Sequence, residues 1–238
     1  RFKIDTVGIT LPGTSVKISD EGEVLVSSRS NFRGYFDDYD ATESSFQEGW
    51  LKTGDAGYID EDGHLVLIGR KEELIRDKQG RAYSPCSIET RLNVSPYIQE
   101  AVVFGSGRPY ITALIAISPV SVGKWAEERK ISFTTYTDLT RQNPVQDLVL
   151  EEVRKANDQL PDHMRIRKFI LLYKPLDADD DELTRTGKVR RHFIYGLYLK
   201  MIEAMYGNEE GLDVKGQVRY GDGRIGTIET TVRIQDAG

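Results

Sequence analysis

The chain has 238 residues, a formal net charge of −6, 39% hydrophobic residues and 29% charged residues. This length allows one or two globular domains, each large enough to bury an apolar core. The negative charge gives no overall attraction to nucleic acid, so we expect no nucleic-acid partner.

Cysteine and histidine content indicates the compartment and the metal content. A single cysteine, Cys86, excludes an internal disulfide framework, and one cysteine with three scattered histidines offers no zinc-ligand spacing. No apolar run approaches the ~20 residues that a membrane-spanning helix needs. We therefore predict a cytoplasmic protein with no metal site and no transmembrane segment, and we leave peripheral membrane contact open.

The first 69 residues have the pattern of short strands and tight turns. Alternating or β-branched segments at 6–19, 23–28 and 64–69 predict strands. The turn signals between them are Pro12-Gly13, Glu21-Gly22 and Asp62-Gly63, the last a strong hairpin signal. Asp40 is expected to cap a short helix that ends before Gly49. This pattern of strands and turns predicts that residues 1–69 form a small β-barrel-like or sandwich subdomain.

Residues 70–238 alternate between strand and helix patterns, which indicates an α+β domain with helices packed on a small sheet. Apolar strands are expected at 99–105, 110–117 and 168–173, and amphipathic helices at about 145–160 and from 189 to about 205. Lys78-Gln79-Gly80 predicts another hairpin, followed by a helix that Ser84-Pro85 begins. We place the domain boundary at residues 69–72.

Two later segments are less regular. The acidic run at 177–182 predicts a solvated loop. The tail at about 214–234 has two strand patterns joined by Asp222-Gly223, which predicts an extra edge hairpin on one of the domains. Partner docking through an exposed strand edge is the alternative for this tail.

Asp55 and Arg70 are the first candidate binding residues. Asp55 follows Gly54 in a turn, where a carboxylate held by the backbone could accept two hydrogen bonds from a vicinal diol such as ribose. Arg70 ends the returning strand, so a hairpin would bring its guanidinium near the same ligand. Taken alone, a turn-capping aspartate and a surface arginine explain these residues as well.

Lys188 is the candidate catalytic residue. In the segment LTRTGKVRR, Gly187 permits a tight loop that presents the lysine ammonium. A point charge there could stabilise developing negative charge on phosphate oxygens. A solvated basic start of a helix remains the alternative from composition alone.

The order of these motifs is more informative than any one of them. The segment GWLKTGDAGYIDEDGHLVLIGRKEELI at 49–75, followed about a hundred residues later by LTRTGKVRR, resembles the C-terminal third of the adenylate-forming enzyme superfamily. The resemblance covers about Thr6 to Tyr198 and is strongest to long-chain fatty-acid acyl-CoA synthetases. Residues 1–69 would then be the C-terminal β subdomain of the large adenylation domain, and 70–238 the mobile C-terminal domain.

The resemblance implies a role for each candidate residue. Asp55 and Arg70 match the residues that bind the ribose of ATP and of the acyl-adenylate. Lys188 matches the mobile lysine that bridges the substrate carboxylate and the α-phosphate. Gly80 lies in the loop that lines the pantetheine tunnel for CoA. Glu72 matches the hinge, where Asp or Lys is usual, so the glutamate departs from the pattern and puts the hinge energetics in doubt.

The resemblance also implies substrates and a missing part. The full-length enzyme would use ATP, Mg2+, CoA and a fatty acid, release AMP, and include a large N-terminal domain. No Gly-rich phosphate loop occurs in this sequence. We therefore expect a C-terminal piece of a fatty acyl-CoA ligase that binds no cofactor and has no activity alone. The alternatives are a piece of an aryl- or medium-chain acyl-CoA ligase, or a non-catalytic nucleotide- or partner-binding module.

Overall fold

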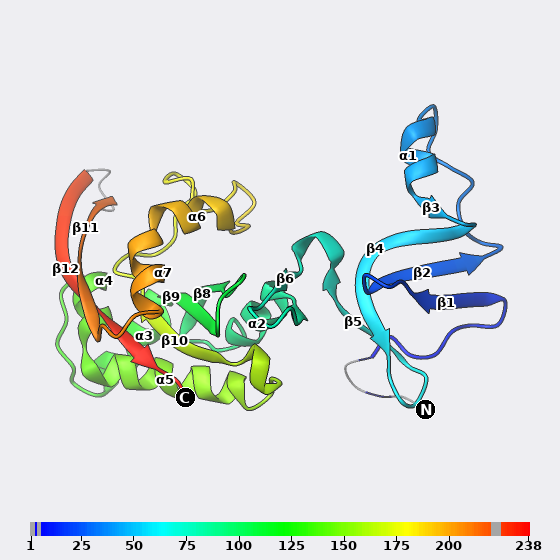
Figure 1. The fold of residues 1–238 in the computed structure, drawn as a ribbon. Helices are drawn as coiled ribbons and strands as arrows, with labels where there is room; N and C mark the ends of the chain where they lie inside the picture. The colour runs from blue at the N-terminus through cyan, green and yellow to red at the C-terminus, as the bar shows by residue number, and fades with distance from the viewer. Residues whose placement is uncertain (1–2, 4–5, 220–224) are drawn as a thin grey trace. The chain divides into compact units, whose positions relative to one another are not determined.

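The computed structural model describes residue 3, residues 6–219 and residues 225–238 (Figure 1). It divides into two compact units. The first contains Arg1–Ile75 and Ala82–Ser87, and the second contains Arg76–Arg81 and Ile88–Gly238. The domain boundary at residues 69–72 stays a prediction.

The first unit is built on an antiparallel sheet of five strands. Its order is β1-β2-β4-β3, and β5 also pairs with β4. The strands are β1 (Thr14–Ile18), β2 (Glu23–Ser28), β3 (Phe46–Gln47), β4 (Trp50–Ile59) and β5 (Leu65–Arg70). Within the described residues this sheet stays open, so the expected barrel-like closure is replaced by an open sheet.

Strand β4 organises this unit because it is long enough to pair with several partners. Its first part pairs with β3, and its second part pairs with β5. The turn between β4 and β5 includes Asp62 and Gly63, as the sequence predicts, and the Asp60 side chain accepts hydrogen bonds from the backbone N–H groups of Asp62 and His64. This hairpin fixes which residues of β4 and β5 face one another.

The short helix α1 (Tyr39–Ser44) is present, but its cap differs from the prediction. Asp38, not Asp40, lies at the N-cap, and its Oδ1 accepts a hydrogen bond from the backbone N–H of Ala41 at 2.9 Å. Asp40 lies inside the first turn, where its negative charge interacts favourably with the positive end of the helix dipole. Adjacent aspartates made the capping position ambiguous in the sequence.

The chain then forms a one-turn 3-10 helix, η1 (Lys71–Glu73), and a two-stranded hairpin of β6 (Ile75–Arg76) and β7 (Ala82–Tyr83). This hairpin encloses Lys78-Gln79-Gly80, as predicted. The next helix, α2 (Pro85–Leu92), follows Ser84, whose hydroxyl accepts a hydrogen bond from the backbone N–H of Ser87 at 3.3 Å.

The second unit contains a mixed sheet of five strands in the order β11-β12-β10-β9-β8. Strands β9 and β10 are parallel, and the other pairs are antiparallel. The strands are β8 (Ile98–Phe104), β9 (Ile111–Ile117), β10 (Ile166–Leu171), β11 (Gly211–Arg219) and β12 (Ile225–Asp236). The helices are α3 (Pro119–Glu128), α4 (Tyr136–Arg141), α5 (Asn143–Asn157), η2 (Asp162–Met164), α6 (Arg191–Leu197) and α7 (Leu199–Met205).

Helices cover both faces of this sheet, with α6 and α7 on one side and α3 and α5 on the other (Figure 1). All seven residues of β9 are buried, as expected for a strand covered on both faces. Leu114 and Ile170 share a core with Ile194, Ile202 and Met205 of α6 and α7. The mixed architecture confirms the predicted α+β fold class.

The C-terminal tail extends this sheet. Strands β11 and β12 pair over nine residues, and β12 then pairs with β10 from Lys168↔Asp236 to Ile170↔Ile234. Val232 and Ile234 of β12 are buried in the same core. The predicted turn at Asp222-Gly223 lies outside the described residues.

Candidate functional site

Asp55 and Arg70 lie directly opposite each other. They are registered partners in the β4–β5 pair, and Asp55 Oδ1 is 3.3 Å from Arg70 Nη1. The Arg70 side chain is 64% exposed and the Asp55 side chain 34% exposed. Both groups therefore face one another at the surface, with Arg70 largely exposed and Asp55 partly exposed.

The sequence predicts a turn at Gly54-Asp55, but both residues lie inside strand β4, at an irregularity in its pairing with β2. Three hydrogen bonds hold this part of the strand. The Thr53 hydroxyl donates to the Val24 carbonyl at 2.8 Å and accepts from the backbone N–H of Asp55 at 3.1 Å. The backbone N–H of Gly54 donates to Glu23 Oε1 at 3.1 Å. These bonds fix the backbone that carries the Asp55 carboxylate.

Glu23 is a supporting residue that sequence reasoning missed. It is only 4% exposed, and its second carboxylate oxygen lies 2.9 Å from Lys71 Nζ. Hydrogen bonds from Lys71 to Glu21 and then to Glu23 raise the pKa of the Lys71 ammonium. The sequence signal was weak, since a glutamate at the start of a strand is ordinarily solvated.

The Asp55–Arg70 pair has the chemistry for a sugar diol. A carboxylate has several lone pairs and can accept two hydrogen bonds while it also contacts a guanidinium. Arg70 Nη1 also donates to the Thr53 carbonyl at 3.3 Å, and the other guanidinium nitrogens carry further N–H donors. An acceptor and a donor side by side on a rigid hairpin can hold a ligand that presents adjacent hydroxyls.

Glu72, the predicted hinge residue, lies in the middle of η1 and is exposed. The residues that flank η1, Arg70 and Leu74, both have extended backbone dihedrals, and no side chain caps this turn. A single short turn between two extended residues leaves few hydrogen bonds to break if the backbone rotates there.

Gly80 is exposed in the β6–β7 hairpin with φ of +81°, and a Cβ there would meet nothing within 4 Å. The left-handed backbone, rather than crowding, therefore requires glycine in this conformation. Asp77 braces the loop: its carboxylate accepts bonds from the backbone N–H groups of Gln79 and Arg81 and from Arg81 Nε. Burial opposes ionisation of Asp77, but the bonds from Arg81 lower its pKa.

Lys188 lies at the end of a tight loop and is exposed. The Thr184 N–H donates to the Lys188 carbonyl at 2.7 Å, and the Lys188 N–H donates to the Thr184 hydroxyl at 3.0 Å. An isolated bridge between Leu183 and Val189 closes the loop. Gly187 has φ of +78°, which allows this turn. The loop therefore presents the lysine ammonium to solvent on a hydrogen-bonded backbone.

Glu182 anchors this loop, contrary to the prediction that the acidic run is a solvated loop throughout. Glu182 is 0% exposed. Its carboxylate lies 2.6 Å from Lys174 Nζ and accepts a bond from the Tyr198 hydroxyl at 2.6 Å and from the Asp177 N–H at 2.9 Å. Its backbone carbonyl accepts from the Arg190 N–H. A buried charge needs such partners, and here they fix both ends of the Lys188 loop.

Burial and charge set the protonation of this cluster. Burial raises the pKa of the Tyr198 hydroxyl, and the Glu182 carboxylate raises it further. Burial opposes the charge on Lys174, but hydrogen bonds to Glu182 and Asp180 outweigh it and raise the Lys174 pKa. Tyr198 therefore keeps its proton and donates a hydrogen bond to Glu182, and Lys174 stays charged beside it.

The described residues contain no group of three or more His, Cys, Asp or Glu side chains placed to hold a metal ion. In the same part of the chain, no helix is both long and apolar enough to cross a membrane. Asp55, Arg70 and Glu72 belong to the first unit, and Gly80 and Lys188 to the second. The structure thus defines the local geometry of each predicted site residue within its own unit.

The structure therefore has a carboxylate–guanidinium pair on a hairpin of the first unit and an exposed lysine on a tight loop of the second. Residues 72–210 match the family model described as the AMP-binding enzyme C-terminal domain. The chain belongs to this family.

Curated relatives are fatty-acid ligases. The long-chain-fatty-acid–CoA ligase FadD15 of Mycobacterium tuberculosis is 39% identical over 212 residues, which cover 87% of this chain and 35% of the ligase. The long-chain-fatty-acid–CoA ligase heimdall of Drosophila melanogaster is 26% identical over 238 residues, with 84% and 35% covered. The chain thus spans about a third of the length of these relatives.

Solved structures have a similar fold. The adenylation domain of a carboxylate reductase from Mycobacterium chelonae matches with a TM-score of 0.59 and 20% identity, over 84% of this chain and 31% of that chain. This likeness supports the placement of the chain among adenylate-forming enzyme folds.

Proposed function

We propose that the chain is the C-terminal part of an ATP-dependent, AMP-forming fatty acyl-CoA ligase. The observation that supports this most is the Asp55–Arg70 pair, registered across β4 and β5 at 3.3 Å, in a chain that belongs to the AMP-binding enzyme C-terminal domain family. The identity to a long-chain-fatty-acid–CoA ligase over 87% of the chain favours a fatty acid as the carboxylate substrate.

The proposed reaction has two steps. In the first, the fatty carboxylate oxygen forms a bond to the α-phosphorus of ATP, and the bond to the β-phosphate oxygen breaks to release pyrophosphate. Asp55 and Arg70 hold the ribose, while the Lys188 ammonium stabilises charge on the carboxylate and phosphate oxygens. In the second step the CoA thiol attacks the acyl carbon, and AMP leaves.

The remaining residues serve the change between these steps. Glu72 is the hinge about which the domain turns, and the Gly80 loop then lines the passage for the pantetheine arm of CoA. Mg2+ neutralises the ATP phosphates in this scheme, and we assign its ligands to parts of the enzyme beyond this chain. The missing N-terminal domain is the proposed partner, and the cytoplasm is the proposed compartment.

Activity assays of the complete gene product and of the 238-residue chain test this proposal. We expect the gene product to catalyse ATP–pyrophosphate exchange that depends on a long-chain fatty acid and to form acyl-CoA, and we expect the chain alone to do neither. A panel of long-chain, medium-chain and aryl acids identifies the acid class. A gene product that binds AMP but forms no adenylate with any of these acids would contradict the ligase proposal and favour a binding module.

A further inference from the structure

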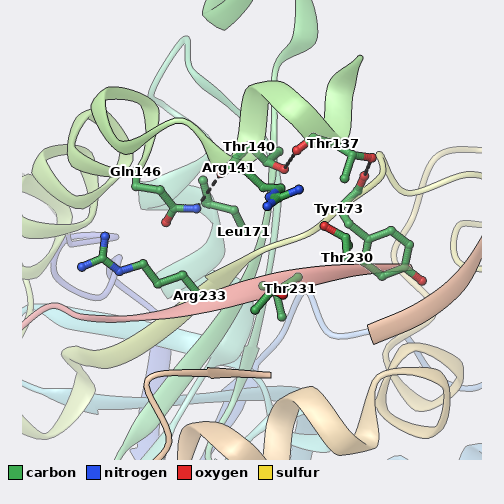
Figure 2. A pocket seen from close by; sticks show the side chains of 10 residues that line it. Thr137, Thr140, Arg141, Gln146, Leu171, Tyr173, Thr230, Thr231 and Arg233 are labelled. Carbon is green, nitrogen blue, oxygen red and sulfur yellow. Dashed lines mark hydrogen bonds between the residues drawn. The ribbon is translucent and has the colours of Figure 1, made fainter. Parts of the chain in front are cut away.

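A small cavity in the second unit lies between helix α4, the end of strand β10 and the tail strand β12 (Figure 2). Its volume is about 80 Å³, well above the ~10–15 Å³ that a cavity needs to hold one water molecule. The side chains that the argument uses are Thr137, Thr140, Arg141, Thr230, Thr231 and Arg233, and we call this cavity the Arg141 pocket. The family match ends at residue 210, so the β12 side of the pocket lies beyond it.

Three of the hydroxyls that line the pocket already donate a hydrogen bond within the protein. Thr137 donates to the Tyr173 carbonyl at 2.7 Å, and Thr140 donates to the Thr137 carbonyl at 2.9 Å. Thr231 donates to Asp213 Oδ1 at 2.6 Å. These groups need no ligand.

Thr230 is different. The residue is only 8% exposed, its Oγ1 is buried, and it has no hydrogen-bond partner among the described residues. A buried hydroxyl without a partner is destabilising, so such groups are rare in native proteins. Figure 2 shows Thr230 among the pocket side chains, on the same side as Arg141. Its hydroxyl therefore has a hydrogen-bonding capacity that no described residue uses.

The two charged side chains that line the pocket are both arginines. The Arg141 side chain makes no hydrogen bond or ion pair with any described residue, and the described partner of the Arg233 side chain is a neutral one, Asn143 Oδ1 at 3.4 Å. No acidic side chain lines the cavity, and the first turn of α5 beside it contains none either. The uncommitted groups are thus N–H and O–H donors, two of them cationic, which select a ligand with several acceptor oxygens and a negative charge.

We propose that the Arg141 pocket binds one phosphate-type oxyanion, held by the Arg141 guanidinium and the Thr230 hydroxyl, with Arg233 at the rim. The size of the cavity admits the phosphate group itself, either as the free anion or as the terminal group of a monoester. This site is independent of the proposed ligase chemistry, because it uses none of its residues.

Titration of the 238-residue chain with inorganic phosphate tests the proposal, with ionic strength held constant by sodium chloride and binding followed by calorimetry. We expect saturable binding that Arg141→Gln weakens about tenfold or more, because it removes a charge-assisted hydrogen bond. Arg154→Gln is the matched control, since it removes the same charge from an exposed site on α5. Equal weakening by the control, or absence of saturable binding, would overturn the site.

Thr230→Val separates a ligand site from a structural role, since it keeps the side-chain shape. We expect it to weaken phosphate binding and to leave the melting temperature without phosphate unchanged or higher. Phosphate binding equal to that of the parent chain would overturn the role of Thr230. Glycerol phosphate in place of phosphate identifies a monoester source if it binds more tightly, and acetate that binds as tightly as phosphate would overturn the phosphate class.

Discussion

Asp55 and Arg70 owe their proximity to strand register. The β4–β5 hairpin pairs them directly, and Glu23 and Thr53 hold the irregular part of β4 that carries the Asp55 carboxylate. Because both side chains are substantially exposed, their ion pair adds little to folding stability, typically below about 1 kcal/mol. The proposed role of the pair in ligand binding can therefore be tested separately from folding stability.

The substitution Asp55→Asn tests this separation in the complete ligase. We expect the KM for ATP to rise about tenfold, because a charged acceptor for the ribose hydroxyls is lost, while the melting temperature stays nearly unchanged. Asp62→Asn is the matched control, since Asp62 lies in the turn of the same hairpin and forms an ion pair with Lys3. An unchanged KM in the Asp55 variant would remove Asp55 from the ribose site.

The proposed role of Lys188 predicts an effect on the adenylation half-reaction alone. Lys188→Ala should slow acid-dependent ATP–pyrophosphate exchange by about 10²–10³, because the ammonium stabilises charge that develops during adenylation. Thioester formation from a supplied acyl-adenylate should be nearly unaffected. Arg185→Ala, which removes another exposed cation from the same loop, is the control. Equal losses in both half-reactions would contradict the assignment of Lys188.

At the scale of elements, the Lys188 loop depends on a buried ion pair. Glu182→Gln leaves Lys174 charged and buried without its main partner, which typically costs about 3–5 kcal/mol. We expect faster hydrogen exchange at the Thr184 and Arg190 amides and a lower free energy of unfolding. Asp180→Asn, which removes the more exposed partner of Lys174, should cost much less. Similar exchange rates in the two variants would show that Glu182 does not anchor the loop.

Local sequence patterns predicted most of the helices, strands and turns, but not the buried contacts that hold them in place. The turn signal at Asp62-Gly63 was sufficient for the β4–β5 hairpin, and so for the approach of Asp55 and Arg70. Glu182 was hidden by its acidic neighbours, because its partners Lys174 and Tyr198 meet it only in three dimensions. Burial of a charge is not visible in a local pattern.

The helix after Lys188 shows a related limit. The sequence predicts one helix to about Met205, whereas the structure has α6 and α7 with Tyr198 between them. Ile194, Tyr198 and Ile202 keep helical spacing and are all buried, so the apolar pattern runs on across the junction. Periodicity alone therefore could not reveal the break.

At the scale of the whole molecule, the tail belongs to the core of the second unit. Removal of residues 211–238 should lower the free energy of unfolding by about 3–6 kcal/mol, because the truncated chain no longer gains the burial of the Val232 and Ile234 side chains. Chemical denaturation of the truncated chain measures this. Lys215→Ala is the control, because it breaks only an exposed ion pair with Glu229. Unchanged stability after truncation would instead favour a tail that serves as a docking arm.

The position of β12 has a consequence for synthesis. Strand β10 pairs with β9 on one edge and with β12 on the other, but β12 leaves the ribosome after β10, with β11 translated between them. Until Asp236 is available, the nascent chain exposes an unpaired strand edge that contains Phe169 and Ile170. Contacts of long sequence separation also slow folding. The chain is therefore prone to aggregate between the translation of β10 and the translation of β12. Slower translation of the tail should increase its dependence on chaperones.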